Sequence, residues 1–461
     1  MGKNPFIVGQ PVPPESFVGR KSEIDAAFDQ IFNRSHLAIW GGAGMGKSSF
    51  LEKLASPQVW EERGEDLSKI VIVLFSCQSI NPFTPSGFWR EVLSGMRDQL
   101  DIEPDLQTEI ETLLAQGLTT KDCLRQILRK LGRKGKSLVL LVDDYDAALQ
   151  ENKQYTEADM VTFLSECRNL AYHSKERNLS MIVTSLMRLN ELGPPLSPAS
   201  SPWYNHYLFQ SLKLLTEQEA EQLLGIAPQT PESQPLRDII REIAGGHPAL
   251  LQNAGSLLYR KLRTAQGTAM DAQAFATAFA REFKSDTRQI FQNIWDRCSE
   301  EEQSLLMLIA LYGLKGRLNE ESYDLSDLDI IFSQKERELT NLEEQGVITR
   351  TELVEQGKVT NIHEKRVGIR TEQGNKKILS FTSSLMEEWV IQELRNTNNE
   401  SLEKRRKVFL NLMSHEQTKN VTQAIRWLWN HTQEISSALE LFGKLSAAFP
   451  KGAIQGLFNW M

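Results

Sequence analysis

Residues 36–209 alternate short apolar runs with longer stretches of helical periodicity. The run over 70–75 is continuously apolar, which is typical of a strand buried on both faces. The pattern predicts strands at 36–40, 70–75, 138–142, 180–183 and 207–209, and helices at about 47–54, 87–100, 120–131 and 157–171. Strands that alternate with helices in this way indicate an α/β fold with a parallel five-stranded sheet covered on both faces.

Beyond the Pro- and Ser-rich connector at 193–202 and the fifth strand, the pattern becomes helical. Thr216 and Glu219 have the spacing of a capping box that opens a helix. A second helix is expected over 236–244, and Pro248 suits the first turn of a third. These helices predict a helical subdomain after the sheet.

A further capping box, Ser299 with Glu302, precedes an apolar stretch. The pattern from this apolar stretch at 305–311 onward predicts a helix, a second helix over 334–344, a strand over 347–351, a polar basic loop, a strand over 377–382 and a helix over 384–394. This order indicates a winged helix. The expected division is a first α/β domain at 1–210, a helical lid at 211–297, a winged-helix domain at 298–395 and a helical tail at 396–461.

The segment from Gly41 to Ser48 reads G-x4-G-K-S and lies between a predicted strand and a predicted helix. Glycines let the backbone curl so that its N–H groups surround a phosphate at the positive end of the helix. Lys47 can reach the β- and γ-phosphate oxygens, and the Ser48 hydroxyl can ligate Mg2+. The predicted binding residues are Gly41, Gly42, Ala43, Gly44, Met45, Gly46, Lys47, Ser48 and Ser49.

Two acids, Asp143 and Asp144, end the predicted strand at 138–142. The carboxyl end of a buried strand faces the crevice where open α/β sheets bind ligands. We expect Asp143 to hold Mg2+ through water and Asp144 to orient or activate the hydrolytic water. A strand that ends in a polar turn is the alternative. Asp146 is interpreted as a turn residue or helix cap rather than a third catalytic acid.

The fourth predicted strand ends in Thr184 and Ser185, and Arg188 follows. A small polar residue at this strand tip can hydrogen-bond the γ-phosphate or the attacking water, so Ser185 is a candidate catalytic residue. Arg188 has three interpretations: a contact to nucleotide, a residue that acts across an oligomer interface, or a solvated loop arginine. Lys47, Asp144, Ser185 and Arg188 are the candidate catalytic set, with Ser48 and Asp143 as metal ligands.

The composition of the chain limits the classes of function that it can have. The chain has 461 residues and a formal net charge of −8, so no overall field attracts nucleic acid, and such a role would need a local basic patch. Four scattered cysteines show no metal-ligand spacing, which fits a reducing cytosol. No apolar run approaches the ~20 residues that span a bilayer, and the first residues lack a signal-peptide core. We expect a cytoplasmic protein without a membrane segment.

Several motifs occur in a fixed order along the chain. They are Phe17-Val18-Gly19-Arg20, the phosphate loop, Asp143-Asp144, Thr184-Ser185, the stretch 214–220 and Gly245-Gly246-His247-Pro248. Together they resemble the signal-transduction ATPases with numerous domains, the STAND branch of the AAA+ superfamily. The resemblance covers about residues 4–265 by motifs and extends to about 395 by domain order.

The resemblance implies further roles. Val18, Gly19 and Arg20 are similar to a family segment that passes over the adenine, although a simple turn before a helix explains them as well. His247 and Pro248 are similar to a lid signature whose proline packs near the base, although Pro248 also suits an ordinary helix start. The family implies ATP and ADP as ligands, and states that differ in how lid and winged helix sit on the nucleotide domain.

One departure concerns a histidine that many family members carry after the last wing strand, where it touches the ADP β-phosphate. The corresponding place here holds Ser383, and His363 lies in the predicted wing loop instead. Locking of the ADP state through that histidine is therefore not expected.

The function that this reading predicts is ATP binding and slow hydrolysis, used as a conformational switch in signalling or defence. Self-association on activation, and a protein partner or trigger, are expected. Adenine is preferred over guanine on the resemblance. The alternatives are a nucleotide-binding scaffold without turnover and a AAA+ DNA-binding ATPase of the origin-initiator type, whose basic wing at 358–377 would track DNA phosphates.

Overall fold

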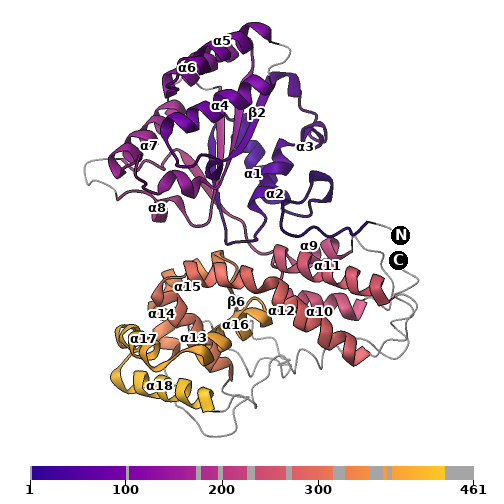
Figure 1. Ribbon diagram of the computed structural model, residues 1–461, viewed down its shortest axis with the longest axis vertical. Helices are drawn as coiled ribbons and strands as arrows, with labels where there is room; N and C mark the ends of the chain where they lie inside the picture. Colours follow the sequence, from indigo (N-terminus) through magenta and orange to yellow (C-terminus); the bar gives the residue numbers. More distant parts are fainter. Residues whose placement is uncertain are drawn as a thin grey trace. The chain divides into compact units, whose positions relative to one another are not determined.

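The computed structural model describes residues 3–99, 103–172, 178–195, 201–225, 234–265, 272–314, 328–352, 367–370 and 376–430 (Figure 1). The chain forms two compact units. The sheet unit comprises Gln10–Gly42 and Gly46–Leu212, and the helical unit comprises Met1–Gly9, Ala43–Met45 and Lys213–Met461. Three residues in the middle of the loop after the first strand, Ala43–Met45, therefore belong to the helical unit.

The sheet unit is built on five parallel strands in the order β2-β3-β4-β1-β5. Their bounds are β1 (His36–Trp40), β2 (Ile70–Ser76), β3 (Ser137–Asp143), β4 (Leu179–Ser185) and β5 (Tyr207–Ser211). The predicted five-stranded sheet is confirmed, and each strand extends at most two residues beyond the predicted ends.

Helices cover both faces of this sheet because successive residues of its strands point to opposite sides. In β3, Val139 and Leu141 belong to one core cluster, and Leu138, Leu140 and Val142 belong to the other. The first cluster includes α1 (Lys21–Phe32), α2 (Lys47–Ala55) and α3 (Pro57–Glu61); the second includes α4 (Pro85–Gln99), α5 (Pro104–Ala115), α6 (Lys121–Arg133), α7 (Glu157–Tyr172) and α8 (Leu189–Leu192). Both faces are apolar, which explains why β3 shows no alternation.

Short 3-10 turns connect these elements. They are η1 (Pro14–Ser16), η2 (Leu67–Lys69), η3 (Cys77–Ser79) and η4 (Tyr145–Leu149). The four helices predicted within the sheet region are confirmed as α2, α4, α6 and α7, whereas α5 was not predicted. Leu106, Ile110 and Leu113 of α5 follow helical spacing and are buried, so the signal was present in the sequence.

The helical unit begins with four helices, namely α9 (Glu217–Leu224), α10 (Gln234–Ala244), α11 (Pro248–Ala265) and α12 (Ala272–Arg297). Three more follow, α13 (Glu300–Leu314), α14 (Leu328–Gln334) and α15 (Glu336–Glu344). A three-stranded antiparallel sheet of order β6-β8-β7 comes next, with β6 (Ile348–Glu352), β7 (Val367–Arg370) and β8 (Lys376–Phe381). The described chain ends with α16 (Ser384–Asn396), α17 (Asn399–Leu412) and α18 (His415–Asn430).

Both predicted capping boxes are present. The Thr216 hydroxyl accepts a hydrogen bond from the Glu219 N–H while the Glu219 carboxylate accepts one from the Thr216 N–H, and Ser299 and Glu302 exchange the same pair. The stretch predicted as a basic wing loop contains a strand, β7, so that prediction was incomplete. The short sequence of β7 has no clear strand pattern of its own. The strand forms because its backbone pairs with that of β8.

The first residues of the chain pack in the helical unit rather than with the sheet. Asn4 Nδ2 donates to Ser256 Oγ at 3.0 Å, and the Ile7 N–H donates to Gln252 Oε1 at 3.0 Å. This arrangement differs from the predicted assignment of residues 1–210 to one domain. Within the described ranges, every helix is too short or too polar to span a membrane.

Two histidines lie together at the amino ends of β1 and β5. The ring centroids of His36 and His206 are 5.4 Å apart, and Tyr207 and Tyr172 complete the cluster. Burial lowers the pKa of His36 to about 4. Burial, followed by the charges of His36 and Arg168, lowers the pKa of His206 to about 3. Both rings are therefore neutral in the folded chain near neutral pH.

We expect this pair to make the fold acid-sensitive. Below about pH 6.5 the unfolded histidines bind protons that the folded ones do not, so stability falls as pH drops from about 6.5 toward 4. At pH 5 the loss is roughly 2 kcal/mol for each histidine. Urea unfolding of wild type and His206→Phe at pH 7.5 and pH 5 measures it. Between pH 7.5 and pH 5, His206→Phe should lose about half as much unfolding free energy through this pair as wild type does. If the variant and wild type lost the same amount, the two histidines would not be the cause of the acid sensitivity.

Candidate nucleotide site

The phosphate loop leaves β1 at Trp40 and enters α2 at Lys47. Gly44 and Gly46 have φ angles of +78° and +87°, a left-handed conformation that favours glycine. The Lys47 ammonium donates to the carbonyl oxygens of Gly41 at 2.6 Å and Gly42 at 3.0 Å. Lys47 therefore lies over the loop, where phosphate oxygens can receive its hydrogen bonds.

The middle of the loop is bonded to the start of α11, and both belong to the helical unit. His247 Nε2 lies 3.1 Å from the Ala43 carbonyl oxygen, and the Ala249 N–H donates to the Gly44 carbonyl oxygen at 3.2 Å. A Cβ on Gly44 would lie 2.7 Å from the Ala249 Cβ, so only glycine fits. Met45 is 1% exposed. The residues that would curl around a phosphate are thus held by backbone contacts within this unit.

The turn before α11 depends on two glycines. Gly245 and Gly246 have φ angles of +58° and +77°. A Cβ on Gly245 would lie 1.6 Å from the Thr382 carbonyl oxygen, and one on Gly246 would lie 2.5 Å from the Leu215 carbonyl oxygen. His247, which follows, is 2% exposed, and Pro248 is the first residue of α11. Close backbone approach on two sides therefore fixes where His247 meets the loop.

Ser383, which the resemblance to the STAND ATPases aligns with a histidine, is a helix-capping residue here. It is 2% exposed, and its hydroxyl accepts a hydrogen bond from the Leu385 N–H at 3.2 Å as the N-cap of α16. Serine is among the preferred residues at such a position. His363 lies outside the described residues.

The acids lie where the strand pattern predicted them. Register pairs Ser76 with Asp143 and Trp40 with Ser185, so the carboxyl ends of β2, β3, β4 and β1 share one edge of the sheet. Asp143 is 8% exposed, and its Oδ1 accepts hydrogen bonds from the Thr184 hydroxyl and from the Asp144 N–H. Asp144 has a left-handed φ of +50°, and its Oδ2 accepts from the Ser76 hydroxyl at 2.7 Å.

The donor set fits a magnesium ion. A carboxylate and a hydroxyl are the hard oxygen ligands that Mg2+ prefers. The hydrogen bonds from Thr184 and Asp144 both reach Asp143 Oδ1, and Ser48 lies half-buried in the first turn of α2. Asp143 and Ser48 would therefore hold the metal.

Asp146 stabilises the loop that follows β4. The Leu186 N–H donates to both of its carboxylate oxygens, at 3.0 and 3.2 Å. Burial raises the pKa of Asp146, while the Leu186 N–H and the charge of Lys47 act in the opposite direction. These bonds fit the interpretation of Asp146 as a structural rather than a catalytic acid.

Two candidates at the tip of β4 have other contacts. Ser185 is fully buried, and its hydroxyl donates to the Met187 carbonyl oxygen at 2.6 Å. The hydroxyl that reaches Asp143 is that of its neighbour Thr184. The Arg188 guanidinium lies 4.9 Å from the centroid of the Trp40 ring. Arg188 is thereby held beside the residue that precedes the phosphate loop.

The segment assigned to the adenine has the geometry of a turn. Gly19 has a φ of +73°, and Arg20 has a φ of +61° as the N-cap residue of α1. Arg20 is 4% exposed and lies 3.5 Å from the Glu23 carboxylate. Val18 precedes this turn as a half-buried residue. Among the loop residues, the Ser49 hydroxyl accepts a hydrogen bond from the Val12 N–H at 3.1 Å.

Sequence reasoning missed Ser76 as a partner of Asp144. The signal was available, because Ser76 ends an apolar strand in the way that Asp143 ends β3. The strand order that makes the two neighbours could not be read from the chain.

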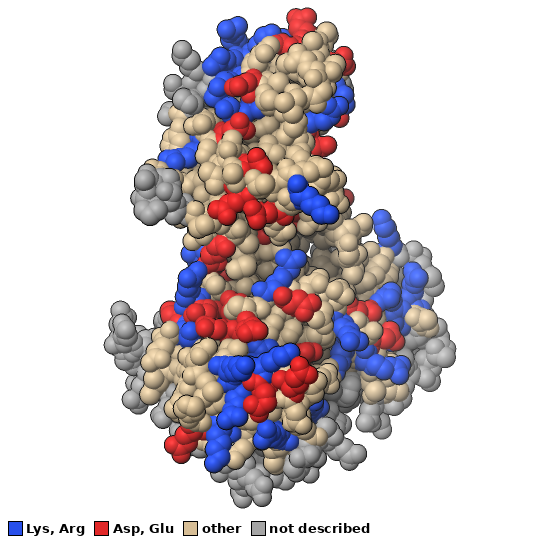
Figure 2. Space-filling view, turned by 60° about the vertical axis from the view of Figure 1, so that its left-hand side comes forward, with Lys and Arg blue, Asp and Glu red and all other residues tan. Residues whose placement is uncertain are grey.

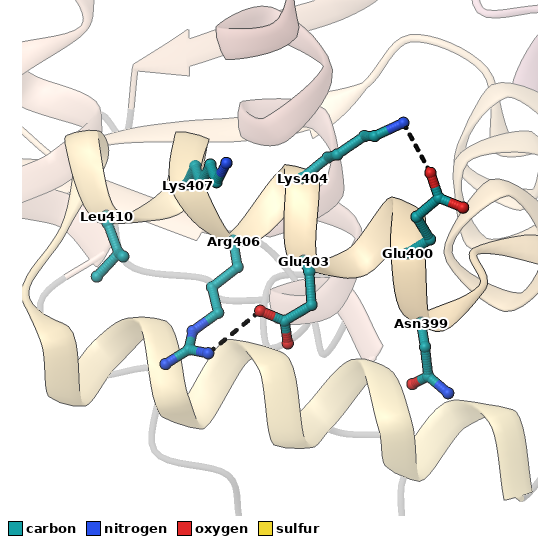
Figure 3. A pocket seen from close by; sticks show the side chains of 7 residues that line it. All are labelled: Asn399, Glu400, Glu403, Lys404, Arg406, Lys407 and Leu410. Atoms are coloured by element: carbon teal, nitrogen blue, oxygen red, sulfur yellow. Dashed lines mark hydrogen bonds and ion pairs between the residues drawn. The ribbon is translucent and has the colours of Figure 1, made fainter.

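The helical unit also holds a groove of about 650 Å³ along α17 (Figure 3). Its lining residues are Asn399, Glu400, Glu403, Lys404, Arg406, Lys407 and Leu410. Lys404 pairs with Glu400 at 3.1 Å, and Arg406 pairs with Glu403 at 3.3 Å. The groove contains none of the nucleotide-site residues, and its charges are largely balanced.

Comparison with known proteins gives two results. A model of the AAA domain matches residues 30–192. Among solved structures, the Walker-type ATPase paby2304 of Pyrococcus abyssi is 14% identical, with a TM-score of 0.51, over 84% of this chain and 99% of that chain. The Aeropyrum pernix ORC2 protein, in ADPNP and ADP complexes, is 13% identical, with a TM-score of 0.47, over 91% of this chain and 98% of that chain. No curated protein matches the chain.

The matched range 30–192 contains the phosphate loop, both acids and four of the five strands. The likeness to the Pyrococcus protein shows the P-loop fold. The AAA-domain match and this fold together support a nucleotide-binding ATPase of the AAA type.

Proposed function

We propose that this protein is a conformational switch that binds ATP and hydrolyses it slowly, as in the STAND ATPases that its motifs resemble. The loop N–H groups and Lys47 bind the phosphates. Ser48 and Asp143 would hold Mg2+, which would supply charge neutralisation at the phosphate oxygens. Asp144 orients and deprotonates the attacking water.

Two contacts support a slow reaction. Asp144 is hydrogen-bonded to Ser76, and Asp143 is hydrogen-bonded to Thr184. A hydrogen bond that a carboxylate accepts favours its charged form, which makes the carboxylate a weaker base toward the proton of water. Slow turnover would let the nucleotide state persist long enough to be read by a partner.

The observation that carries the switch is the bonding of the loop to α11. His247 and Ala249 contact the backbone of Ala43 and Gly44, which lie inside the phosphate-binding segment. A nucleotide that changes the path of this loop changes these contacts, and a switch needs such a difference between two states. The helical unit is therefore the part that would report ATP or ADP.

Light scattering with ADP and with a non-hydrolysable ATP analogue tests the proposal. We expect a monomer with ADP and association with the analogue, as for a switch that assembles on activation. The His247→Ala variant should have the same particle mass with ADP and with the analogue, because the phosphate loop loses its contact with the His247 side chain. Equal mass of the wild type in both states would contradict assembly and favour a nucleotide-binding scaffold.

The alternative function is that of a DNA-binding ATPase of the initiator type acting through the wing. Its support is the register that places Arg370 opposite Lys376 and Ile369 opposite Lys377 at the β7–β8 connection. This function predicts DNA binding that Lys376→Gln/Lys377→Gln removes. The experiment below includes that variant.

A further inference from the structure

A basic segment of the sheet unit takes no part in the nucleotide site. Residues 121–136 contain seven Lys or Arg and one acid, in a chain whose formal net charge is −8. Figure 2 shows Lys and Arg, with some Asp and Glu among them, on the surface of the sheet unit around α5 and α6. This local excess of positive charge is the kind of patch that a polyanion needs on an acidic protein.

Six of the seven cations at 121–136 fall into two groups, and the seventh, Lys121, pairs with Glu166 at 3.8 Å. Lys130 pairs with Glu109, and Lys134 and Lys136 pair with Glu103, so these three face acids of the α5 region. Arg125, Arg129 and Arg133 form the second group, spaced four residues apart along one stripe of the helix. Arg125 of this group also pairs with Asp122 at 3.0 Å.

The arginine row is fixed by the burial of the opposite face. Leu124, Ile127, Leu128 and Leu131 are each 0% exposed in the core of the sheet unit. Three arginines at this spacing cover about 12 Å along the helix axis. One DNA strand carries a phosphate about every 3.4 Å of helix axis, so the row spans three to four phosphates.

A fourth arginine is brought beside this row by Asn178. The Asn178 amide donates to the Leu128 carbonyl oxygen at 3.4 Å, and its oxygen accepts a hydrogen bond from Arg34. Gly132 makes room, because a Cβ there would lie 2.0 Å from Asn178 Nδ2. Glycine inside a helix costs about 1 kcal/mol relative to alanine. The close approach of Asn178 explains why glycine rather than a larger residue occupies position 132.

We propose that Arg34, Arg125, Arg129 and Arg133 form a surface that binds the phosphate backbone of nucleic acid without sequence preference. Guanidinium groups suit phosphate oxygens because they donate two parallel hydrogen bonds. A membrane surface fits less well, since an interfacial helix needs its apolar face for the lipid and that face of α6 is buried. This surface lies outside the nucleotide site and does not depend on the proposed switch.

The test is fluorescence anisotropy with a labelled 30-base-pair duplex of random sequence, without nucleotide, over a range of KCl concentrations. Wild type should bind with an affinity that falls steeply with salt. Arg129→Gln/Arg133→Gln should bind about tenfold more weakly at low salt, and the slope of log affinity against log salt should drop by about 2. Arg129→Lys/Arg133→Lys should keep most of the slope because it keeps the charge.

Two controls have the same change of charge elsewhere. Lys404→Gln/Lys407→Gln on α17 and Lys376→Gln/Lys377→Gln on the wing should bind like wild type. Basal ATP turnover should be unchanged in Arg129→Gln/Arg133→Gln, which shows that it is folded. The proposal is overturned if wild type does not bind the duplex, if the α6 variant binds equally well, if either control loses as much, or if only phosphatidylserine vesicles bind. Because no nucleotide is present, these outcomes do not bear on the ATP switch.

Discussion

Lys47→Ala should lower the affinity for ATP and for ADP by at least about 100-fold. The Lys47 ammonium lies against the loop through the carbonyl oxygens of Gly41 and Gly42, and each charge-assisted hydrogen bond that it makes to a phosphate is worth about 1.5–3 kcal/mol. Isothermal titration calorimetry measures both affinities.

Lys53→Ala is the matched control for that experiment. Lys53 belongs to the same helix, but its ammonium donates to the Pro14 carbonyl oxygen at 3.3 Å. This variant should bind both nucleotides like wild type. Wild-type affinity in Lys47→Ala would reject the nucleotide site as described here.

Asp144→Asn should bind ATP like wild type and hydrolyse it about 10² to 10⁴ times more slowly. The amide oxygen can still accept the hydrogen bond from Ser76, so the local geometry is kept while the base is lost. Steady-state phosphate release at saturating ATP and Mg2+ measures the effect.

Asp143→Asn provides the contrast. It should mainly raise the Mg2+ concentration needed for activity, because Asp143 is the buried carboxylate assigned to the metal. A wild-type rate in Asp144→Asn would move the catalytic role to another group. If both variants showed the same rate of hydrolysis and the same Mg2+ requirement, Asp143 and Asp144 would not have the separate roles of metal ligand and base.

The features that sequence patterns predicted well are local ones. The phosphate loop, the strand that ends in Asp143 and the capping box at Thr216 each depend on residues within a few positions of one another. These patterns can be recognised in the sequence because their physical cause is local. Strands buried on both faces are apolar, and the start of a helix needs an acceptor for its free N–H groups.

The features that were missed depend on which segments become neighbours. Ser76 and Asp144 meet because β2 and β3 are adjacent in the sheet, although 68 positions separate them. Thr184 rather than Ser185 reaches Asp143, since successive side chains of a strand point to opposite faces. The contact of His247 with Ala43 joins residues 204 positions apart, and only the folded chain reveals it.

The central claim is that the phosphate loop transmits the nucleotide state to α11, and Asp144→Asn allows a direct test because it should hold ATP without consuming it. Hydrogen exchange at the Ala249 N–H, which donates to the Gly44 carbonyl oxygen, reports the contact itself. We expect at least about tenfold faster exchange with ATP than with ADP, since the ATP state should release the loop from α11. Equal exchange with both nucleotides, each at saturation, would contradict the claim.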